Sequence, residues 1–194
     1  MITSNPYHGE RRPGTVGKSL ADVEMKITDP ETGKEMAEGD VGMIEVRGPN
    51  VFKGYWNMPD KTALELRETG YFITGDLGKL SSDGYLSIVG REKDLIISGG
   101  YNVYPKEIED VLNELDKIDE TAVFGILDND FGERVVAAVV MLENESFDKS
   151  KTEIFVNDKL ARYKQPKEYF VLDSLPRNSM GKVQKNELRK QFSN

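Results

Sequence analysis

The hydrophobic pattern of this chain changes character at the charged tetrad Arg91-Glu92-Lys93-Asp94. Before the tetrad, apolar and polar residues alternate over short segments separated by Gly, Pro and Asp turns, which is typical of short β-strands. After it, segments with helical spacing are mixed with strand-like segments. We therefore predict an α+β fold in two parts, with a β-rich, barrel-like subdomain at residues 1–93 and a compact α+β domain at residues 94–194.

The first part is predicted to consist mainly of short strands, after a loop rich in Gly and Pro over residues 1–20. Strands are expected at residues 23–27, 42–47, 50–55, 71–73, 77–80 and 85–89. Asp60, whose carboxylate suits an N-cap, is expected to begin a short helix that runs through Leu64. Many short strands at this spacing favour a barrel or a small sandwich.

The second part is predicted to mix helices and strands. Pro105 stands at the favoured first position of a helix, and the apolar residues that follow it recur at helical spacing on one face. Further helices are expected at residues 152–163 and near Leu188 and Phe192, with strands at 94–97, 121–127, 134–142 and 169–172.

The composition excludes several classes of protein. The chain of 194 residues has no Cys and one His, which excludes disulfides, thiolate metal sites and a site built from several histidines. A net charge of −8 argues against a nucleic-acid partner, since phosphate contacts need clustered Lys and Arg. The longest apolar run, residues 135–142, is too short to span a bilayer, and no leader pattern opens the chain. We therefore expect a cytoplasmic protein without membrane contact.

Charge is unevenly distributed along the chain. Residues 151–194 hold ten Lys and Arg against five Asp and Glu, so the acidic excess lies upstream. This basic end could face a compact polyanion such as ATP or coenzyme A. The alternative is a solvated surface with uneven charge.

Four segments carry the chemistry, and their order is more informative than any one of them. They are Gly42–Gly48 with Gly54-Tyr55-Trp56; Gly70–Asp76; Gly90–Asp94 with Ser98–Pro105 and Glu107–Glu109; and Leu175–Lys185. In this order, and over essentially the whole chain, they resemble the late motifs of the superfamily of acyl-CoA synthetases, peptide-synthetase adenylation domains and luciferases.

The resemblance implies two half-reactions. A carboxylate attacks the α-phosphate of ATP to give an acyl-adenylate and pyrophosphate, and the thiol of coenzyme A then displaces AMP to give a thioester. It also implies that ATP and Mg²⁺ are bound mainly by a part of the enzyme upstream of Met1, and that residues 94–194 pivot between the two steps.

The resemblance assigns roles to individual residues. Lys182 matches the catalytic lysine, whose ammonium would stabilise negative charge that builds around the α-phosphate. Gly181 before it lets the turn approach the nucleotide closely. Asp76 matches the aspartate that accepts hydrogen bonds from the ribose hydroxyls, and Arg91 matches an arginine at the ribose or phosphate. Taken alone, these residues indicate a turn lysine, a turn-capping aspartate and a surface ion pair, and the functional interpretation rests on the four motifs together.

Two further positions concern the pivot and the thioester step. Asp94 matches the hinge, where one short polar residue absorbs a large backbone change. Gly99-Gly100-Tyr101 resembles the loop that closes on the pantetheine arm of coenzyme A, although it also reads as a tight turn before the Pro105 helix. Lys164 and Lys167 are candidates for phosphates of coenzyme A or AMP, with solvated lysines as the alternative.

The opening of the chain bears on the substrate. Residues 1–17, together with Ala161–Lys185, resemble malonyl-CoA synthetases, which implies malonate or methylmalonate as the carboxylate. Met1 would align with a methionine that lines the substrate pocket. The far carboxylate of such a substrate needs a cation, for which Arg11 and Arg12 are candidates, with surface charges as the alternative.

The chain has no Ser/Thr/Gly-rich phosphate loop, so we expect that this polypeptide alone forms no adenylate. Other interpretations remain open. They are a peptide-synthetase adenylation fragment, a short- or medium-chain acyl-CoA ligase of other specificity, and a non-catalytic domain that binds coenzyme A or a nucleotide. The end of the chain at Asn194, without a carrier-binding segment, argues against the first of these.

Overall fold

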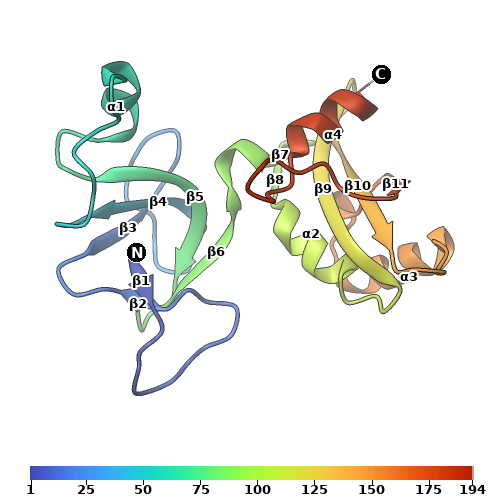
Figure 1. Ribbon diagram of the computed structural model, residues 1–194, viewed down its shortest axis with the longest axis horizontal. Helices are drawn as coiled ribbons and strands as arrows, with labels where there is room; N and C mark the ends of the chain where they lie inside the picture. Colours follow the sequence, from blue (N-terminus) through green and yellow to red (C-terminus); the bar gives the residue numbers. More distant parts are fainter. Residues whose placement is uncertain (194) are drawn as a thin grey trace. The chain divides into compact units, whose positions relative to one another are not determined.

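The structure is a computed structural model that describes residues 1–193. It divides into two compact units, Met1–Lys93 and Asp94–Asn194, which are described separately (Figure 1). Among the described residues, no helix combines the length and the apolar character that crossing a bilayer requires.

The first unit is built on an antiparallel sheet of four strands. The strands, in spatial order, are β3 (Glu24–Thr28), β4 (Gly42–Arg47), β5 (Phe72–Leu80) and β6 (Leu86–Arg91). The short strands β1 (Thr3–Ser4) and β2 (Lys18–Ser19) pair separately, and α1 (Pro59–Glu65) follows β4. The α+β class is confirmed, but within residues 1–193 the sheet does not close into a barrel, because β3 and β6 remain its edges.

Three details of this unit differ from the prediction. Residues 50–55 form a loop instead of a strand: Gly54 has φ of 151°, and the Phe52 ring packs edge-on against Phe72. The two strands predicted at residues 71–73 and 77–80 are one strand, β5 (Phe72–Leu80), whose pairing with β6 shifts after Leu77. The N-cap of α1 is Met58, so Asp60 lies in the first turn, where its charge still complements the helix dipole.

The second unit is a mixed sheet covered by helices on both faces. Its elements are β7 (Ile96–Ser98), β8 (Tyr101–Val103), α2 (Pro105–Leu112), β9 (Ile118–Asp128), β10 (Gly132–Met141), α3 (Lys149–Lys159), β11 (Glu168–Leu172) and α4 (Lys185–Phe192). Strand β10 pairs with β9 and β7 in antiparallel fashion and with β11 in parallel. The predicted start of α2 at Pro105 is confirmed, whereas α3 begins earlier than predicted, because Asp148 caps it by accepting a hydrogen bond from the Lys151 amide.

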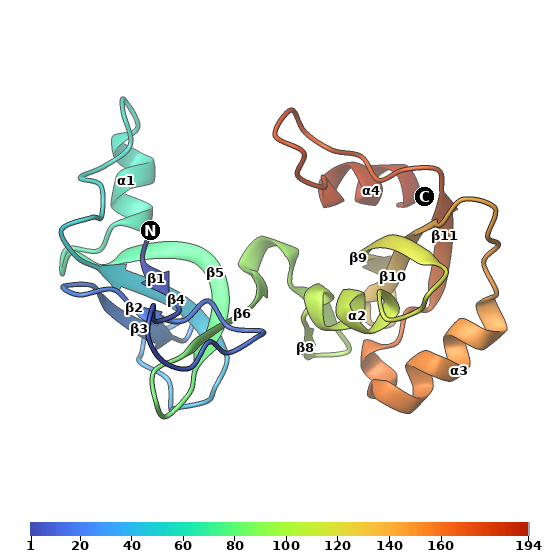
Figure 2. The same cartoon turned by 60° about the horizontal axis from the view of Figure 1, so that its bottom comes forward.

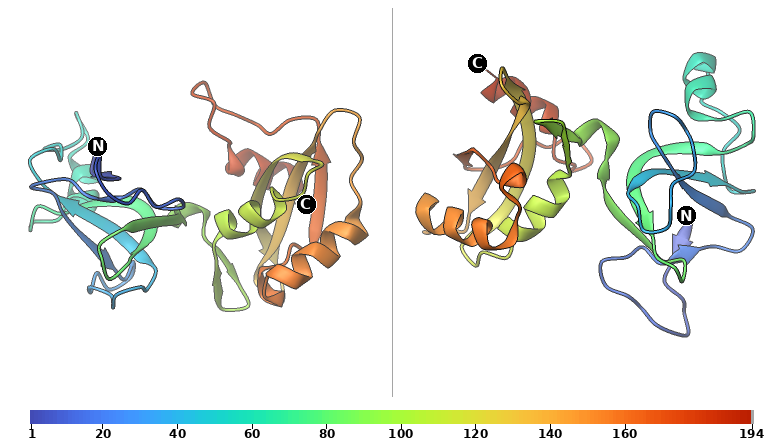
Figure 3. Two further views of the ribbon diagram at one scale, coloured as in Figure 1. Left: turned by 90° about the horizontal axis from the view of Figure 1, so that it is seen from below. Right: turned by 180° about the vertical axis from the view of Figure 1, so that it is seen from behind.

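Alternate residues of β9 and β10 supply two separate apolar cores. On one face, Val123, Val135 and Val139 pack with buried residues of α2 and α3. On the other face, Phe124 and the even-numbered residues of β10 pack with Leu188 of α4. Figure 3 (left) shows α4 on one side of these strands and α2 and α3 on the other. Because both faces are buried, residues 135–142 read as a continuous apolar run instead of an alternating one.

A largely buried ion pair joins the helices of the two faces. Glu109 Oε1 on α2 lies 2.6 Å from Lys185 Nζ at the start of α4, and each side chain is 15% exposed. The same oxygen accepts a hydrogen bond from the Val123 amide at 2.8 Å, on a strand that pairs only with β10 in the described chain. One carboxylate therefore ties α2, α4 and the edge of β9 together.

Candidate functional site

Lys182 lies in a tight turn of the loop between β11 and α4. Figure 2 shows this loop leading into α4. The Asn178 side chain accepts hydrogen bonds from the amides of Met180 at 3.0 Å and Lys182 at 2.9 Å. Gly181 has φ of 77°, a conformation that favours glycine. The Lys182 side chain is exposed, and within residues 1–193 it makes no ion pair. Its ammonium is therefore available to an anionic ligand.

Asp76 and Arg91 are brought together by the register of β5 and β6, in which they are direct partners. Arg91 Nε lies 2.8 Å from Asp76 Oδ1, and Arg91 Nη1 donates a hydrogen bond to the Thr74 carbonyl at 3.3 Å. Arg91 also lines a hollow of about 390 Å³ beside Tyr55 and Gly75. The sequence predicted both residues at one site, and the structure adds that they form an ion pair with each other.

Asp94 is the last residue of the 3₁₀ turn Glu92–Asp94 and the first residue of the second unit. Its Oδ1 lies 3.7 Å from Arg189 Nη1 on α4, and both side chains are mostly buried. The hinge role stays a prediction. The ion pair connects the start of the second unit to the helix that follows Lys182.

The Gly99-Gly100 turn joins β7 to β8, and both glycines have positive φ, 58° and 80°. Gly99 and Tyr101 line a mainly apolar hollow of about 450 Å³. Tyr101 stacks on Tyr163 with ring centroids 4.7 Å apart. The remaining lining residues are Ser98, Phe131, Arg162 and Lys167. An apolar hollow with cations at its rim suits a ligand that carries both a thin organic arm and phosphates.

Lys164 and Lys167, the two lysines predicted as candidates for phosphate binding, differ in their surroundings. Lys164 Nζ lies 2.6 and 2.7 Å from the carboxylate oxygens of Glu107 on α2, so its charge is already paired. Lys167 lines the hollow described above and, within the described chain, has no ion pair. Lys167 is therefore the stronger phosphate candidate. The sequence did not predict a role for the aromatic residues Phe131 and Tyr163 of this hollow, although Tyr163 directly precedes Lys164.

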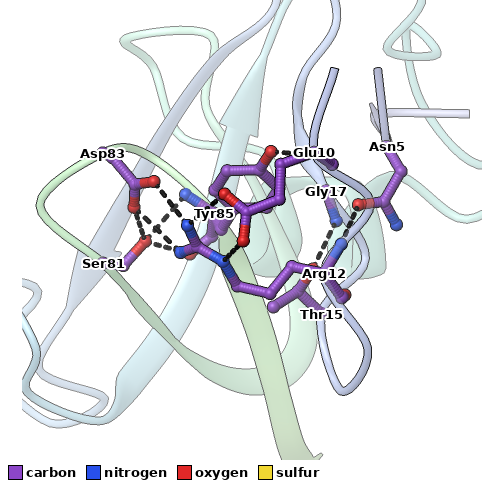
Figure 4. A network of polar contacts seen from close by, with 8 residues as sticks. All are labelled: Asn5, Glu10, Arg12, Thr15, Gly17, Ser81, Asp83 and Tyr85. Carbon is purple, nitrogen blue, oxygen red and sulfur yellow. Dashed lines mark hydrogen bonds and ion pairs between the residues drawn. The ribbon is translucent and has the colours of Figure 1, made fainter. Parts of the chain in front are cut away.

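The Arg12 side chain makes contacts that stabilise the opening loop (Figure 4). Its guanidinium lies 2.8 Å from Asp83 and 3.1 Å from Glu10, and it covers the ring of Tyr85 at 4.1 Å. The hydrogen bonds from Arg12 and then from Ser81 lower the pKa of Asp83 to about 2. Arg12 thus anchors the loop of residues 10–17 and is not available to a substrate carboxylate. Met1 is 91% exposed, and its role in a substrate pocket stays a prediction.

Within residues 1–193, no group of three or more His, Asp or Glu side chains is placed to hold a metal ion.

Two family models match the chain in the expected order. The AMP-binding enzyme model matches residues 1–56, and the model of the AMP-binding enzyme C-terminal domain matches residues 107–182, which include Lys182. The chain belongs to the AMP-binding enzyme family. The chain is 43% identical to a malonate–CoA ligase of Arabidopsis thaliana, in a match that covers 100% of the chain and 33% of that relative. It is also 43% identical to an indoleacetate–CoA ligase of Aromatoleum aromaticum over 95% of its length, or 36% of that relative.

Solved structures agree with this assignment. ATP-bound MatB from Rhodopseudomonas palustris is 53% identical, with a TM-score of 0.95, and the match covers all of the chain and 39% of MatB. An o-succinylbenzoate–CoA synthetase of Bacillus subtilis, in complex with its acyl-adenylate, is 36% identical over 93% of the chain and 36% of that structure, with a TM-score of 0.84. The chain thus spans about a third of the length of the relatives it matches.

Proposed function

We propose that this chain forms part of an acid–thiol ligase that converts a carboxylate to its acyl-adenylate with ATP and then to a thioester with coenzyme A. The observation that carries the proposal is the match of the whole chain to 39% of ATP-bound MatB, and the exposed Lys182 and the Asp76–Arg91 ion pair, which the sequence motifs single out, support it. The upstream part of such an enzyme, outside this chain, would supply most of the ATP site.

In this proposal, different residues act in each of the two half-reactions. In the first, the carboxylate oxygen attacks the α-phosphorus, the bond to the β-phosphate breaks, and Lys182 stabilises the charge that develops. In the second, the thiol attacks the acyl carbon and AMP leaves. The Gly99–Tyr101 loop and the hollow beside it, with Lys167 at its rim, support a role in holding coenzyme A. Asp76 and Arg91 would bind the ribose, and Asp94 would be the hinge residue.

We propose malonate or methylmalonate as the carboxylate. The resemblance of residues 1–17 to malonyl-CoA synthetases supports this choice. The identity to MatB, 53%, is also higher than the 36% identity to the o-succinylbenzoate–CoA synthetase. An activity on another carboxylate is the second candidate, because the malonate and indoleacetate ligases are equally similar to this chain.

The test uses the longer enzyme, in which this chain is joined to an upstream AMP-binding region. ATP–pyrophosphate exchange is measured with malonate, methylmalonate, acetate and indoleacetate, and thioester formation is measured from supplied malonyl-adenylate. Lys182→Ala is expected to lower exchange by about 10²–10³-fold, the loss typical for one electrostatic group, while thioester formation is largely kept.

Exchange of equal rate in the Lys182→Ala variant would contradict the role of this lysine. A preference for indoleacetate over malonate would support the second candidate. The 194-residue chain alone is expected to show no exchange above its Lys182→Ala control.

A further inference from the structure

The turn that carries Lys182 is also linked to strand β9 by the Arg177 side chain. Arg177 Nη1 donates a hydrogen bond to the Gly181 carbonyl at 2.7 Å, and Arg177 Nη2 pairs with the Glu120 carboxylate on β9. One guanidinium thus links the peptide group directly before Lys182 to the central sheet of the second unit. The functional assignments above use neither Glu120 nor Arg177.

Backbone hydrogen bonds from Gly181 to the Asn178 carbonyl and from Asn178 to the Lys182 carbonyl, both 2.9 Å, close the turn on itself. Met180 at its tip is 73% exposed, and no atom of another residue lies within 4 Å of where a Cβ on Gly181 would be. The Asn178 hydrogen bonds shape the turn internally, but they do not attach it to the sheet. The isolated bridge between Arg177 and Val183 closes the base of the turn. The Arg177 guanidinium is therefore the side-chain contact that links the far side of the turn to β9.

We propose that Glu120 and Arg177 are positioning residues for Lys182 in the adenylation step, an inference that rests on the proposed function. The lysine stem has four rotatable bonds, so its ammonium can be preorganised only if the backbone at its base is fixed. Electrostatic stabilisation of a transition state depends on such placement, and a displacement of about 1 Å can cost ~10²-fold in rate. Arg177 acts through the Gly181 carbonyl, and Glu120 acts by holding Arg177.

The exposure of the pair separates positioning from simple stabilisation. The Arg177 side chain is 44% exposed and that of Glu120 is 28% exposed. Ion pairs this accessible to water contribute little to folding stability, because solvent screens them. A purely structural pair would leave both half-reactions unchanged, whereas a positioning pair would affect the step that uses Lys182.

The first experiment measures both half-reactions in the longer enzyme. Arg177→Ala and Glu120→Ala are each expected to lower kcat for ATP–pyrophosphate exchange by ~10–100-fold, with KM for ATP and the rate of thioester formation from malonyl-adenylate nearly unchanged. Glu120→Gln, which still accepts a hydrogen bond from Arg177, should retain much of the rate. Lys117→Ala is the matched control, because Lys117 directly precedes β9, which carries Glu120, and its ion pair with Glu145 touches nothing in the turn.

The second experiment does not depend on activity. Backbone ¹⁵N relaxation of the 194-residue chain should show increased mobility at Gly181 and Lys182 in Arg177→Ala, but not in Lys117→Ala. Equal loss of both half-reactions, or unchanged exchange with unchanged mobility, would overturn the positioning role. If the parent enzyme forms no adenylate from any carboxylate, the proposed function fails, while the relaxation data still decide whether Arg177 orders the turn.

Discussion

The two units of this chain are stabilised in different ways. In the second unit, strands β9 and β10 are buried on both faces, and two apolar clusters extend into α2, α3 and α4. In the first unit, the single cluster holds four fully buried residues, α1 buries none of its own, and Trp56 is 89% exposed. The second unit therefore resembles a complete small domain. The first unit depends more on polar networks.

The central network of the first unit surrounds Glu45, which is fully buried on β4. Its Oε1 accepts hydrogen bonds from Arg67 at 2.6 and 2.9 Å and from Thr28 at 2.9 Å, and Lys26 lies 3.4 Å from Oε2. Burial raises the pKa of Glu45, but the Arg67 and Thr28 hydrogen bonds and the neighbouring cations outweigh it, so that the pKa lies below its usual value. Glu45 thus remains charged in the core of the sheet.

The largest effect is expected from Phe124→Ala in the second unit. Phe124 is fully buried and packs against the rings of Phe170 and Phe192. Removal of a buried Phe side chain leaves a cavity that costs about 3–5 kcal/mol. Denaturant unfolding measures the loss, with Leu127→Ala as the control, since Leu127 lies on the same strand and is 86% exposed. Equal small losses in both variants would contradict the view that the second unit depends on its apolar core.

A smaller effect is expected from Arg67→Ala in the first unit. Breaking a buried ion pair typically costs ~3–5 kcal/mol. Here Lys26 and Thr28 remain as partners and Arg67 is 38% exposed, so we expect about 2 kcal/mol. The control is Arg47→Ala, whose pair with Glu24 is exposed on both sides and should be worth less than ~1 kcal/mol. A loss no greater than that of the control would show that the Glu45 network is not central to the first unit.

The smallest effect concerns the anchor of the opening loop, and it depends on pH. Asp83 has a pKa of about 2 in the folded protein, below its ordinary value of 3.8. Its contribution to stability is therefore fully present above about pH 4 and is lost as the pH falls towards 2. The Tm of Asp83→Asn should lie slightly below that of the parent at pH 7, and the difference should shrink between pH 4 and 2.

Asp158 is exposed on α3 and makes no ion pair with any residue of 1–193, so Asp158→Asn should show no such trend. A difference in Tm between Asp83→Asn and the parent that stays constant over this pH range would contradict the anchoring role of Asp83.

The elements that the sequence predicted well have strong local causes. Pro105 begins α2 because its fixed φ and missing N–H suit the first helical position, and the apolar run at residues 135–142 lies in a strand buried on both faces. The prediction was wrong at residues 50–55, where the aromatic packing of Phe52 with Phe72, a residue distant in sequence, replaced strand pairing. Such contacts between distant segments leave no periodic signal.

The candidate site shows the same limit. The motifs predicted Lys182, Asp76 and Arg91 individually, but the pairing of Asp76 with Arg91 follows from the register of β5 and β6, which a shift at Leu77 alters locally. Glu120 lies 57 residues before Arg177, so its contact with the Lys182 turn could not be inferred from spacing. The residues that support a site were therefore less predictable than the residues proposed to act in it.

The ion pair between Glu109 and Lys185 has a mechanical consequence. It fastens α2, which follows the Gly99-Gly100 loop, to α4, which follows the Lys182 turn, and the Val123 amide holds both to the sheet. The two loops are thus anchored to one connected set of helices and strand. If residues 94–194 pivot as the family resemblance implies, this connection predicts that both loops move together and that the backbone change is confined to the residues around the predicted hinge, Asp94.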